Sequence, residues 1–220
     1  MRRPALKVGL ILALGVALLA LRIHRRRRLP RETASVVQTF PAHSPATVLH
    51  VVDGDTAYFT LPDGGRVKAR LAGVNTPECH KQQIRLPGGG RSARCIRDDE
   101  LYGLAAYREL VRLLSRGPLE LNCERKRDGR CRRGRYGRVL VTIRAAGADV
   151  AEQLVRAGAG WAYTKYPAAN AAALCRAEET ARRQKAGMWR QGDVEQVLAR
   201  MSPRTRAWLE THDARCAAAR

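Results

Sequence analysis

The clearest alternation of apolar and polar side chains lies at residues 66–71, where Val, Ala and Leu alternate with Arg and Lys. This period of two predicts a half-buried antiparallel β-strand. Two runs rich in β-branched residues precede it, at 47–52 and 56–61, and both read as strands. The Pro-Asp-Gly-Gly sequence at 62–65 is a turn signal between the last two. The first third of the body therefore predicts a meander of three strands.

Beyond residue 100 the pattern changes between the helical and the strand period. Leu104, Tyr107, Val111 and Leu114 follow helical spacing, which predicts a helix over 101–114. Further strands are predicted at 119–123 and 136–144, and further helices at 150–157, 169–185 and 204–219. Three successive glycines and many charges predict that residues 79–99 form a loop, and the basic stretch 125–135 reads as a hairpin loop.

Five strands with helices inserted and appended are typical of a small barrel. The predicted fold class is α+β: a five-stranded OB-fold β-barrel with inserted and C-terminal helices. Residues 47–190 are expected to form this domain and to be monomeric, with a helical extension over 191–220. Residues 29–46, which contain three prolines, are expected to be a linker.

The head of the chain, residues 1–28, combines arginines with fourteen uncharged residues from Val8 to Leu21. This apolar length suits a signal peptide and is short for a membrane span. The arginine cluster at 25–28 disfavours cleavage, so we expect an uncleaved membrane anchor or a poor signal. We place the protein in a bacterial-type cell envelope, anchored or exported. Its orientation stays open, because the positive-inside rule would keep residues 25–28 in the cytoplasm, whereas the cysteines favour export.

The net charge of +21 indicates anionic partners. The head holds eight cations and no acids, which leaves 33 basic against 20 acidic residues in the body. The body is therefore basic in its own right, as expected of a protein that captures polyanions such as nucleic acid.

Six cysteines are present without any Cys-x-x-Cys, which disfavours a structural zinc site. The even number favours disulfides if the body is exported. The alternative is six reduced thiols in a cytosolic protein. The expected pairs are Cys123 with Cys131, which flank the hairpin loop, Cys79 with Cys95, which bound the glycine-rich stretch, and Cys175 with Cys216 by elimination.

Three short motifs carry possible chemistry. Asp53-Gly54-Asp55-Thr56 offers two carboxylates that can bend toward a hard cation, although Asp-Gly is also a common turn. Arg70 is followed eight residues later by the carboxylate of Glu78 in a Thr-Pro-Glu turn. Arg135-Tyr136-Gly137-Arg138 opens the fifth predicted strand. Each motif alone has a plain structural reading as a turn, a surface charge or a hairpin flank.

In this order and setting, the three motifs resemble the staphylococcal nuclease family, over about 48–189. Supporting matches are Tyr102-Gly103, the Leu-Val-Arg-x-Gly sequence at 154–158, Tyr163 and Trp189. The resemblance implies an OB barrel, in agreement with the strand count. It also implies a calcium-dependent phosphodiesterase that hydrolyses DNA or RNA, single-stranded or double-stranded, with little sequence preference.

The resemblance also implies a role for each matching residue. Arg70 and Arg138 would bind the phosphate, and Glu78 would position or deprotonate the attacking water. Arg135, Tyr136 and Tyr163 would bind the nucleotide. The expected metal ligands are Asp55, Asn75 and the backbone carbonyl of Thr76.

Asn75 departs from the family pattern, which has a carboxylate at that position. An amide oxygen can still bind calcium, but one negative charge is missing. Weaker calcium binding is therefore expected, and a different divalent cation stays open as an alternative.

Two other functions compete with the nuclease. One is a non-catalytic nucleic-acid-binding OB-type module tethered at the membrane. The other is an envelope interaction protein whose charge serves anionic lipid. Neither explains why Asp55, Arg70, Glu78 and Arg138 occur together, so the enzyme is the leading reading.

Overall fold

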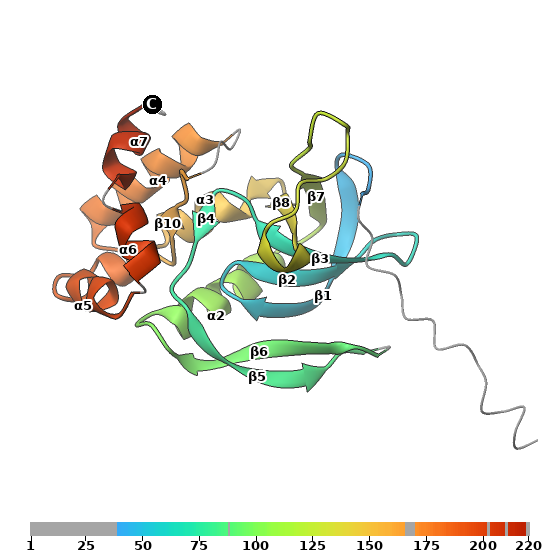
Figure 1. Cartoon of the computed structure of the whole chain (residues 1–220), viewed down its shortest axis with the longest axis horizontal. Helices are drawn as coiled ribbons and strands as arrows, with labels where there is room; N and C mark the ends of the chain where they lie inside the picture. The colour runs from blue at the N-terminus through green and yellow to red at the C-terminus, as the bar shows by residue number, and fades with distance from the viewer. Residues whose placement is uncertain (1–38, 88, 166–169, 202, 210, 219–220) are drawn as a thin grey trace, which may run out of the picture. The chain divides into compact units, whose positions relative to one another are not determined.

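The computed structural model describes residues 39–87, 89–165, 170–201, 203–209 and 211–218. Its centre is a five-stranded β-barrel, as predicted (Figure 1). The strands lie in the order β3-β2-β1-β7-β8, and a parallel pairing of β3 with β8 closes the barrel. The barrel strands are β1 (Ser44–Asp53), β2 (Thr56–Thr60), β3 (Arg66–Leu71), β7 (Leu119–Cys123) and β8 (Val139–Ala145).

The barrel encloses the apolar face that the alternation predicts. In β3 every second residue is buried, and the side chains of Val67 and Ala69 are 0% exposed. Phe59, Leu121 and Val141 meet them in the same cluster from other strands. Because burial of such side chains is the main favourable term in folding, this face fixes the register of the sheet.

Three helices and several short elements complete the domain. Helix α2 (Gly103–Leu114) buries Leu110 and Leu113 against the barrel core. Helix α3 (Val150–Arg156) is capped at its N-terminus by the Asp149 side chain, which accepts the Glu152 N–H at 2.9 Å. The other elements are α4 (Ala171–Gln184), β4 (Val74–Asn75), β9 (Ala148–Asp149), β10 (Trp161–Ala162) and the 3₁₀ turns η1 (Arg135–Gly137) and η2 (Gly187–Trp189).

The C-terminal extension contains α5 (Asp193–Arg200), α6 (Pro203–Leu209) and α7 (His212–Ala218). The single helix predicted at 204–219 is therefore wrong. A turn at Thr211, whose N–H bonds the Trp208 carbonyl at 3.3 Å, separates α6 from α7. Trp208, in α6, and His212, at the start of α7, are both buried. Trp208 joins a second apolar cluster with Trp161, Met188, Val197 and Met201.

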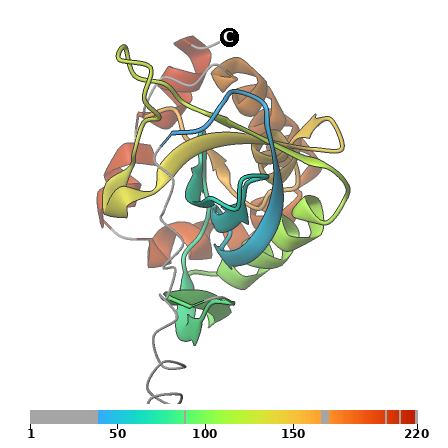
Figure 2. The ribbon, with the colours of Figure 1, turned by 90° about the vertical axis from the view of Figure 1, so that its right-hand side faces the viewer.

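The loop predicted at 79–99 is a two-stranded ribbon, so that prediction is wrong. It consists of β5 (Cys79–Arg85) and β6 (Arg91–Asp98), paired antiparallel outside the barrel sheet (Figures 1 and 2). Polar side chains occur on both faces of the ribbon, so its sequence lacks the apolar alternation of a core strand. Backbone pairing forms it instead, with help from the barrel: His50 Nε2 donates to the Ala93 carbonyl at 2.9 Å.

The fifth strand begins later than the predicted 136–144. Strand β8 starts at Val139, and residues 135–137 form the 3₁₀ turn η1. Tyr136 has a φ of 62° there, a left-handed conformation that no strand residue adopts. The Tyr-Gly-Arg motif therefore sits on a turn that leads into β8.

All three predicted disulfides are confirmed. The Cα atoms of Cys79 and Cys95 are 5.7 Å apart, and those of the pairs Cys123–Cys131 and Cys175–Cys216 are 5.5 Å apart. The first closes the base of the β5–β6 ribbon, the second closes the β7–β8 loop, and the third joins α7 to α4.

The predicted membrane segment at 8–21 lies outside the described residues, so it stays a prediction. Within the residues that are described, no helix has the length and apolar character needed to cross a membrane.

Candidate functional site

The turn between β1 and β2 places two buried carboxylates at the mouth of the barrel. Asp53 and Asp55 are 8% and 6% exposed. A Cβ atom on Gly54 would lie 2.6 Å from Thr76 Oγ1, so only glycine lets this turn pack against Thr76. The Asp55 carboxylate accepts hydrogen bonds from Thr56 Oγ1 at 2.9 Å and from Thr76 Oγ1 at 3.4 Å.

Arg70, in β3, joins this turn to the segment that carries Asn75. Its guanidinium forms an ion pair with Asp55. Its Nη2 atom donates to Asn75 Oδ1 at 3.1 Å and to the Val74 carbonyl at 3.2 Å. The side chain is 13% exposed, so this pairing neutralises a charge that would be costly to bury alone.

The groups around Arg70 shift its pKa. Burial, and next the nearby Arg138, lower the pKa to about 10, although Asp53, Glu78 and Tyr163 each raise it. Arg70 therefore stays protonated at neutral pH. The same interactions show that two arginines and several anionic groups share one electrostatic neighbourhood.

Arg138 contacts the residue of the turn that follows Asp55. Its Nη1 atom donates to Thr56 Oγ1 at 3.0 Å. The ring of Tyr136, which is 75% exposed, lies with its centroid 5.8 Å from the Arg138 guanidinium carbon. Tyr136 therefore presents an open aromatic surface beside a cation. The backbone of Arg135 lies in η1, and its side chain is outside the described part of the structure.

Glu78 is held through its backbone and directs its carboxylate outward. Its N–H donates to Glu100 Oε2 at 2.8 Å, and its carbonyl accepts the Glu100 N–H at 2.9 Å. A Cβ atom on Gly103 would lie 2.1 Å from that carbonyl, which explains the glycine at the start of α2. The Glu78 side chain itself is 63% exposed. The backbone of Glu78 is therefore held in place, while its carboxylate stays accessible to solvent.

Lys81 was not among the residues predicted for the site. Its Nζ atom lies 2.9 Å from Glu78 Oε2 and 3.1 Å from Asp53 Oδ2, so it bridges two carboxylates of the site. Burial lowers the pKa of Lys81, but Asp53 and Glu78 outweigh that effect, and the pKa lies above its ordinary value. Lys81 comes from β5, the region expected to be a loop. Lys81 could have been predicted as a site residue only if residues 79–98 had been recognised as a ribbon.

Tyr163 lies at the edge of the site. Its N–H donates to the Gly73 carbonyl at 2.7 Å, and its ring packs on Trp208 of α6 with centroids 4.8 Å apart. Just before it, β10 pairs with β4, which places Trp161 opposite Asn75. The C-terminal extension thus contacts the strands that hold the site.

The predicted metal ligands have suitable chemistry for a hard cation. Asp55, Asn75 and the Thr76 carbonyl supply only oxygen donors, which calcium prefers. Asp55 and Asn75 both contact the Arg70 guanidinium, so their oxygens face a common cationic group. The residues present therefore fit a divalent ion in donor type.

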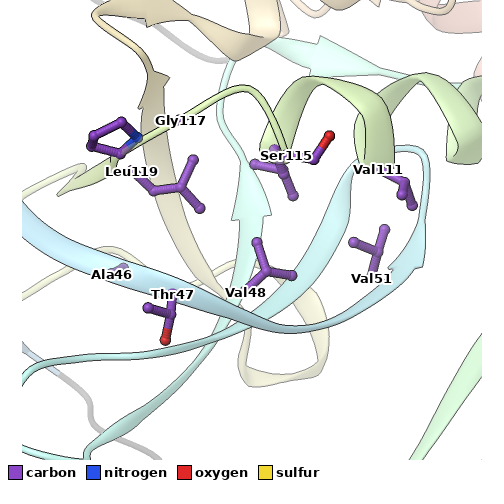
Figure 3. Close-up of a pocket in the computed structure, with 10 residues that line it drawn as sticks. Ala46, Thr47, Val48, Val51, Val111, Ser115, Gly117 and Leu119 are labelled. Atoms are coloured by element: carbon purple, nitrogen blue, oxygen red, sulfur yellow. The ribbon is translucent and has the colours of Figure 1, made fainter.

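A hollow elsewhere on the molecule lacks groups for catalysis. It lies between β1 and the C-terminal end of α2 (Figure 3). Its lining includes Val48, Val51, Val111 and Leu119 and contains no titratable side chain. The hollow therefore differs from the site at the β1–β2 turn, which is lined by charged side chains.

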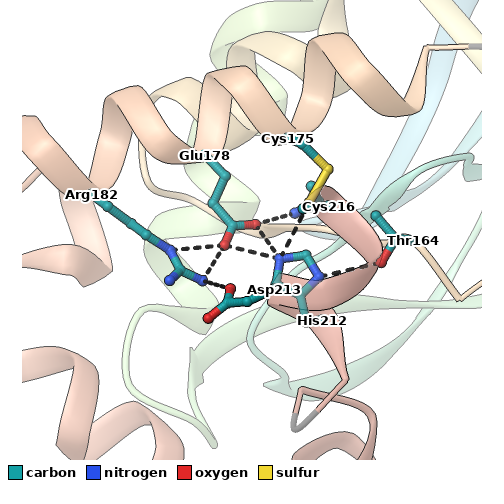
Figure 4. Close-up of a disulfide and its surroundings, with 8 residues drawn as sticks. Thr164, Cys175, Glu178, Arg182, His212, Asp213 and Cys216 are labelled. Carbon is teal, nitrogen blue, oxygen red and sulfur yellow. Dashed lines mark hydrogen bonds and ion pairs between the residues drawn. A yellow bond between two sulfur atoms is a disulfide. The ribbon is translucent and has the colours of Figure 1, made fainter. Parts of the chain in front are cut away.

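A second cluster of potential metal ligands is Glu178, His212 and Asp213 (Figure 4). Glu178 is 3% exposed, and its carboxylate already accepts the Ala162 N–H at 2.8 Å and His212 Nε2 at 2.9 Å. Arg182 also donates to it, with Nη2 at 2.5 Å, and pairs with Asp213 at 3.2 Å. Protein cations and N–H groups satisfy these acids, so the cluster is a structural ion-pair network.

One family model, described as staphylococcal nuclease homologue, matches residues 68–191. The match spans more than half of the 220 residues and includes Arg70, Asn75, Glu78 and Arg138. The β1–β2 turn with Asp55 lies before it. No curated protein matches the chain. The extent of the family match and the closed barrel show that this chain belongs to the staphylococcal nuclease family.

Proposed function

We propose that the chain is a metal-dependent phosphodiesterase that hydrolyses DNA or RNA with little sequence preference, and that calcium is its metal. The observation that carries the proposal is that two arginines contact neighbouring residues of one acidic turn. Arg70 contacts Asp55, and Arg138 contacts the adjacent Thr56. Glu78 joins the same neighbourhood through Lys81 and Asp53.

Each group suits a step of phosphodiester hydrolysis. Arg70 and Arg138 pair their planar N–H forks with the nonbridging phosphate oxygens, on which charge grows in the transition state. The accessible carboxylate of Glu78 orients the attacking water or accepts its proton. Asp55, Asn75 and the Thr76 carbonyl would hold calcium, which supplies charge stabilisation and helps orient the water. Arg135, Tyr136 and Tyr163 would bind the nucleotide.

A cleavage assay with the full-length chain tests the proposal. Supercoiled plasmid, single-stranded DNA and RNA should all be cut in calcium, and a chelator should abolish cleavage. Binding without cleavage in any divalent ion would instead favour a non-catalytic nucleic-acid-binding module.

We also propose that residues 1–28 tether this domain at the cell envelope. Three disulfides support the proposal, because such bonds persist in oxidising compartments. Fractionation of cells followed by thiol mapping without reductant tests it. Free thiols at Cys123 and Cys131 in protein taken from cells would argue for a reducing compartment.

Replacing Asn75 with aspartate is expected to tighten calcium binding about tenfold, because affinity follows the charge of the ligands. Isothermal titration calorimetry measures the change. Asn122→Asp, the same substitution in β7 of the barrel, is the control and should leave the calcium affinity unaltered. If Asn75→Asp gave no gain, Asn75 would not belong to the coordination shell.

Replacing Lys81 with methionine is also expected to tighten calcium binding about tenfold. The ammonium group neutralises Asp53 and Glu78, and it would repel a dication held by the neighbouring ligands. A tenfold gain in affinity corresponds to about 1.4 kcal/mol. Lys126→Met, in the exposed β7–β8 loop, is the matched control. Weaker calcium binding by Lys81→Met would mean that Lys81 serves to hold the acids in place.

A further inference from the structure

The β5–β6 ribbon concentrates positive charge directly next to the candidate site. From His80 to Arg97 the sequence contains five Lys or Arg residues and no Asp or Glu. Lys81 faces Asp53 and Glu78. The other four cations are exposed, and the described residues provide no hydrogen bond or ion pair to their side chains: Arg85, Arg91, Arg94 and Arg97.

Several arginines on the helices are instead paired with acids. Arg112, Arg156 and Arg183 each pair with a glutamate three or four residues away on the same helix. Such ion pairs lower the positive electrostatic potential of the surface, because each glutamate offsets the charge of its arginine. Acidic groups of the ribbon and its surroundings lie at its base, where Lys81 pairs with Asp53 and Glu78 and His80 pairs with Asp99. Toward the turn the arginines carry the only charges of the described ribbon residues, so the field there suits a polyanion-binding surface.

The ribbon is held firmly at several points, so the positions of its arginines are defined. A disulfide joins Cys79 to Cys95 at its base. Arg66 of the barrel donates to the carbonyls of Pro87 and Gly89 at the turn, at 2.9 Å and 3.3 Å. A preorganised surface loses less entropy on binding than a mobile loop would.

The register places the arginines along the length of the ribbon. Arg97 lies opposite His80 near Glu78, Arg94 lies opposite Gln82, and Arg91 lies opposite Arg85 at the far end. Arg97 lies six positions after Arg91 in the chain, which corresponds to about 20 Å of extended strand. That length corresponds to roughly six base-pair steps of a duplex.

From this arrangement we propose that the β5–β6 ribbon is a docking arm for double-stranded nucleic acid, whose backbone phosphates contact Arg85, Arg91, Arg94 and Arg97. The inference rests on the proposed function only in taking nucleic acid as the substrate. Residues 79–98 contain no Phe, Tyr or Trp, and single-strand binders depend on aromatic side chains for base stacking. A two-stranded ribbon also fits the major groove of a DNA duplex.

Binding of a labelled DNA duplex to the full-length chain tests the proposal. Fluorescence anisotropy in a chelator reports binding without cleavage, so a failure of the proposed activity does not affect the readout. Arg94→Gln with Arg97→Gln should weaken duplex binding about tenfold and reduce the slope of log affinity against log salt by about 2. Adding Arg85→Gln and Arg91→Gln should roughly double the loss of slope.

Two variants control for charge and for folding. Arg176→Gln with Arg200→Gln removes the same charge from exposed positions on α4 and α5 and should leave the slope unaltered. Arg94→Lys with Arg97→Lys keeps the charge and should keep the slope.

Single-stranded DNA of the same sequence and vesicles of phosphatidylglycerol and phosphatidylcholine complete the test. The ribbon substitutions should change binding to both much less than binding to duplex. An equal loss on single strands, an unchanged duplex slope, or a loss confined to vesicles would overturn the docking arm.

Discussion

Glutamine in place of Glu78 is expected to slow the cleavage of single-stranded DNA by about 100-fold or more, because an amide cannot accept a proton from water. The substitution keeps the shape of the side chain. Glu78 is 63% exposed and is held through backbone hydrogen bonds, so the fold should be unaffected. Single-turnover cleavage in saturating calcium isolates the chemical step from binding.

Glu195→Gln, which removes an exposed carboxylate from α5, is the control and should cleave at the wild-type rate. Arg70→Ala and Arg138→Ala are expected to lose about 100-fold as well, since each removes a donor to the transition state. Arg138 gives the cleaner result, because Arg70 also neutralises the buried Asp55. Near wild-type rates in all three variants would mean that the site is wrongly assigned.

The barrel could be predicted because its strands bury one face. The bounds predicted for β3 and β7 are those observed, since alternation at 66–71 and 119–123 directly encodes which side chains enter the core. The disulfide pairs were predictable for a related reason. A hairpin brings Cys123 and Cys131 together, and once two pairs are assigned only one remains.

The ribbon could not be predicted, because local sequence does not determine it. Its residues have polar side chains on both faces, and the three glycines at 88–90 indicate only a turn. What stabilises it is distant in sequence, such as the hydrogen bonds from His50 and Arg66. Lys81 was missed with it, although it bridges Asp53 and Glu78.

The positions of the motif residues could be predicted from the sequence, but the residues that they contact in the structure could not. The Arg-to-Glu spacing at 70 and 78 suggested two groups that face a phosphate. It did not indicate that Arg70 would bond both Asp55 and Asn75, two of the expected metal ligands. This contact suggests that cation binding and the position of Arg70 are coupled, because both involve the same oxygens.

Glutamine in place of Glu178 is expected to destabilise the protein by about 3–5 kcal/mol, the cost of breaking a buried ion pair. Glu178 and His212 are 3% and 1% exposed, and the carboxylate also accepts hydrogen bonds from Arg182 and Ala162 (Figure 4). Glutamine has nearly the same volume, so a cavity would not explain the loss. Thermal unfolding with the disulfides intact should show a melting temperature lower by roughly 10 °C.

The matched control is Glu179→Gln at the next position of the same helix. Glu179 is 46% exposed and pairs with Arg183 at 3.2 Å, so its loss should cost less than about 1 kcal/mol. Equal stability of the two variants would show that the buried network contributes nothing beyond a surface pair.

The pH dependence gives a second signature of the same network. Burial alone would raise the pKa of Glu178, but His212, Arg182 and the Ala162 N–H outweigh it, and the folded pKa lies below its ordinary value. Its contribution to stability is therefore complete at neutral pH and is lost as the pH falls through that lowered pKa, below the ordinary carboxyl range near about 4.3. The stability difference between wild type and Glu178→Gln should narrow in acid. Ala162, which donates to Glu178, lies in β10, and β10 pairs with the strand that carries Asn75. Protonation of Glu178 in acid should therefore also weaken the packing that holds Asn75 at the candidate site.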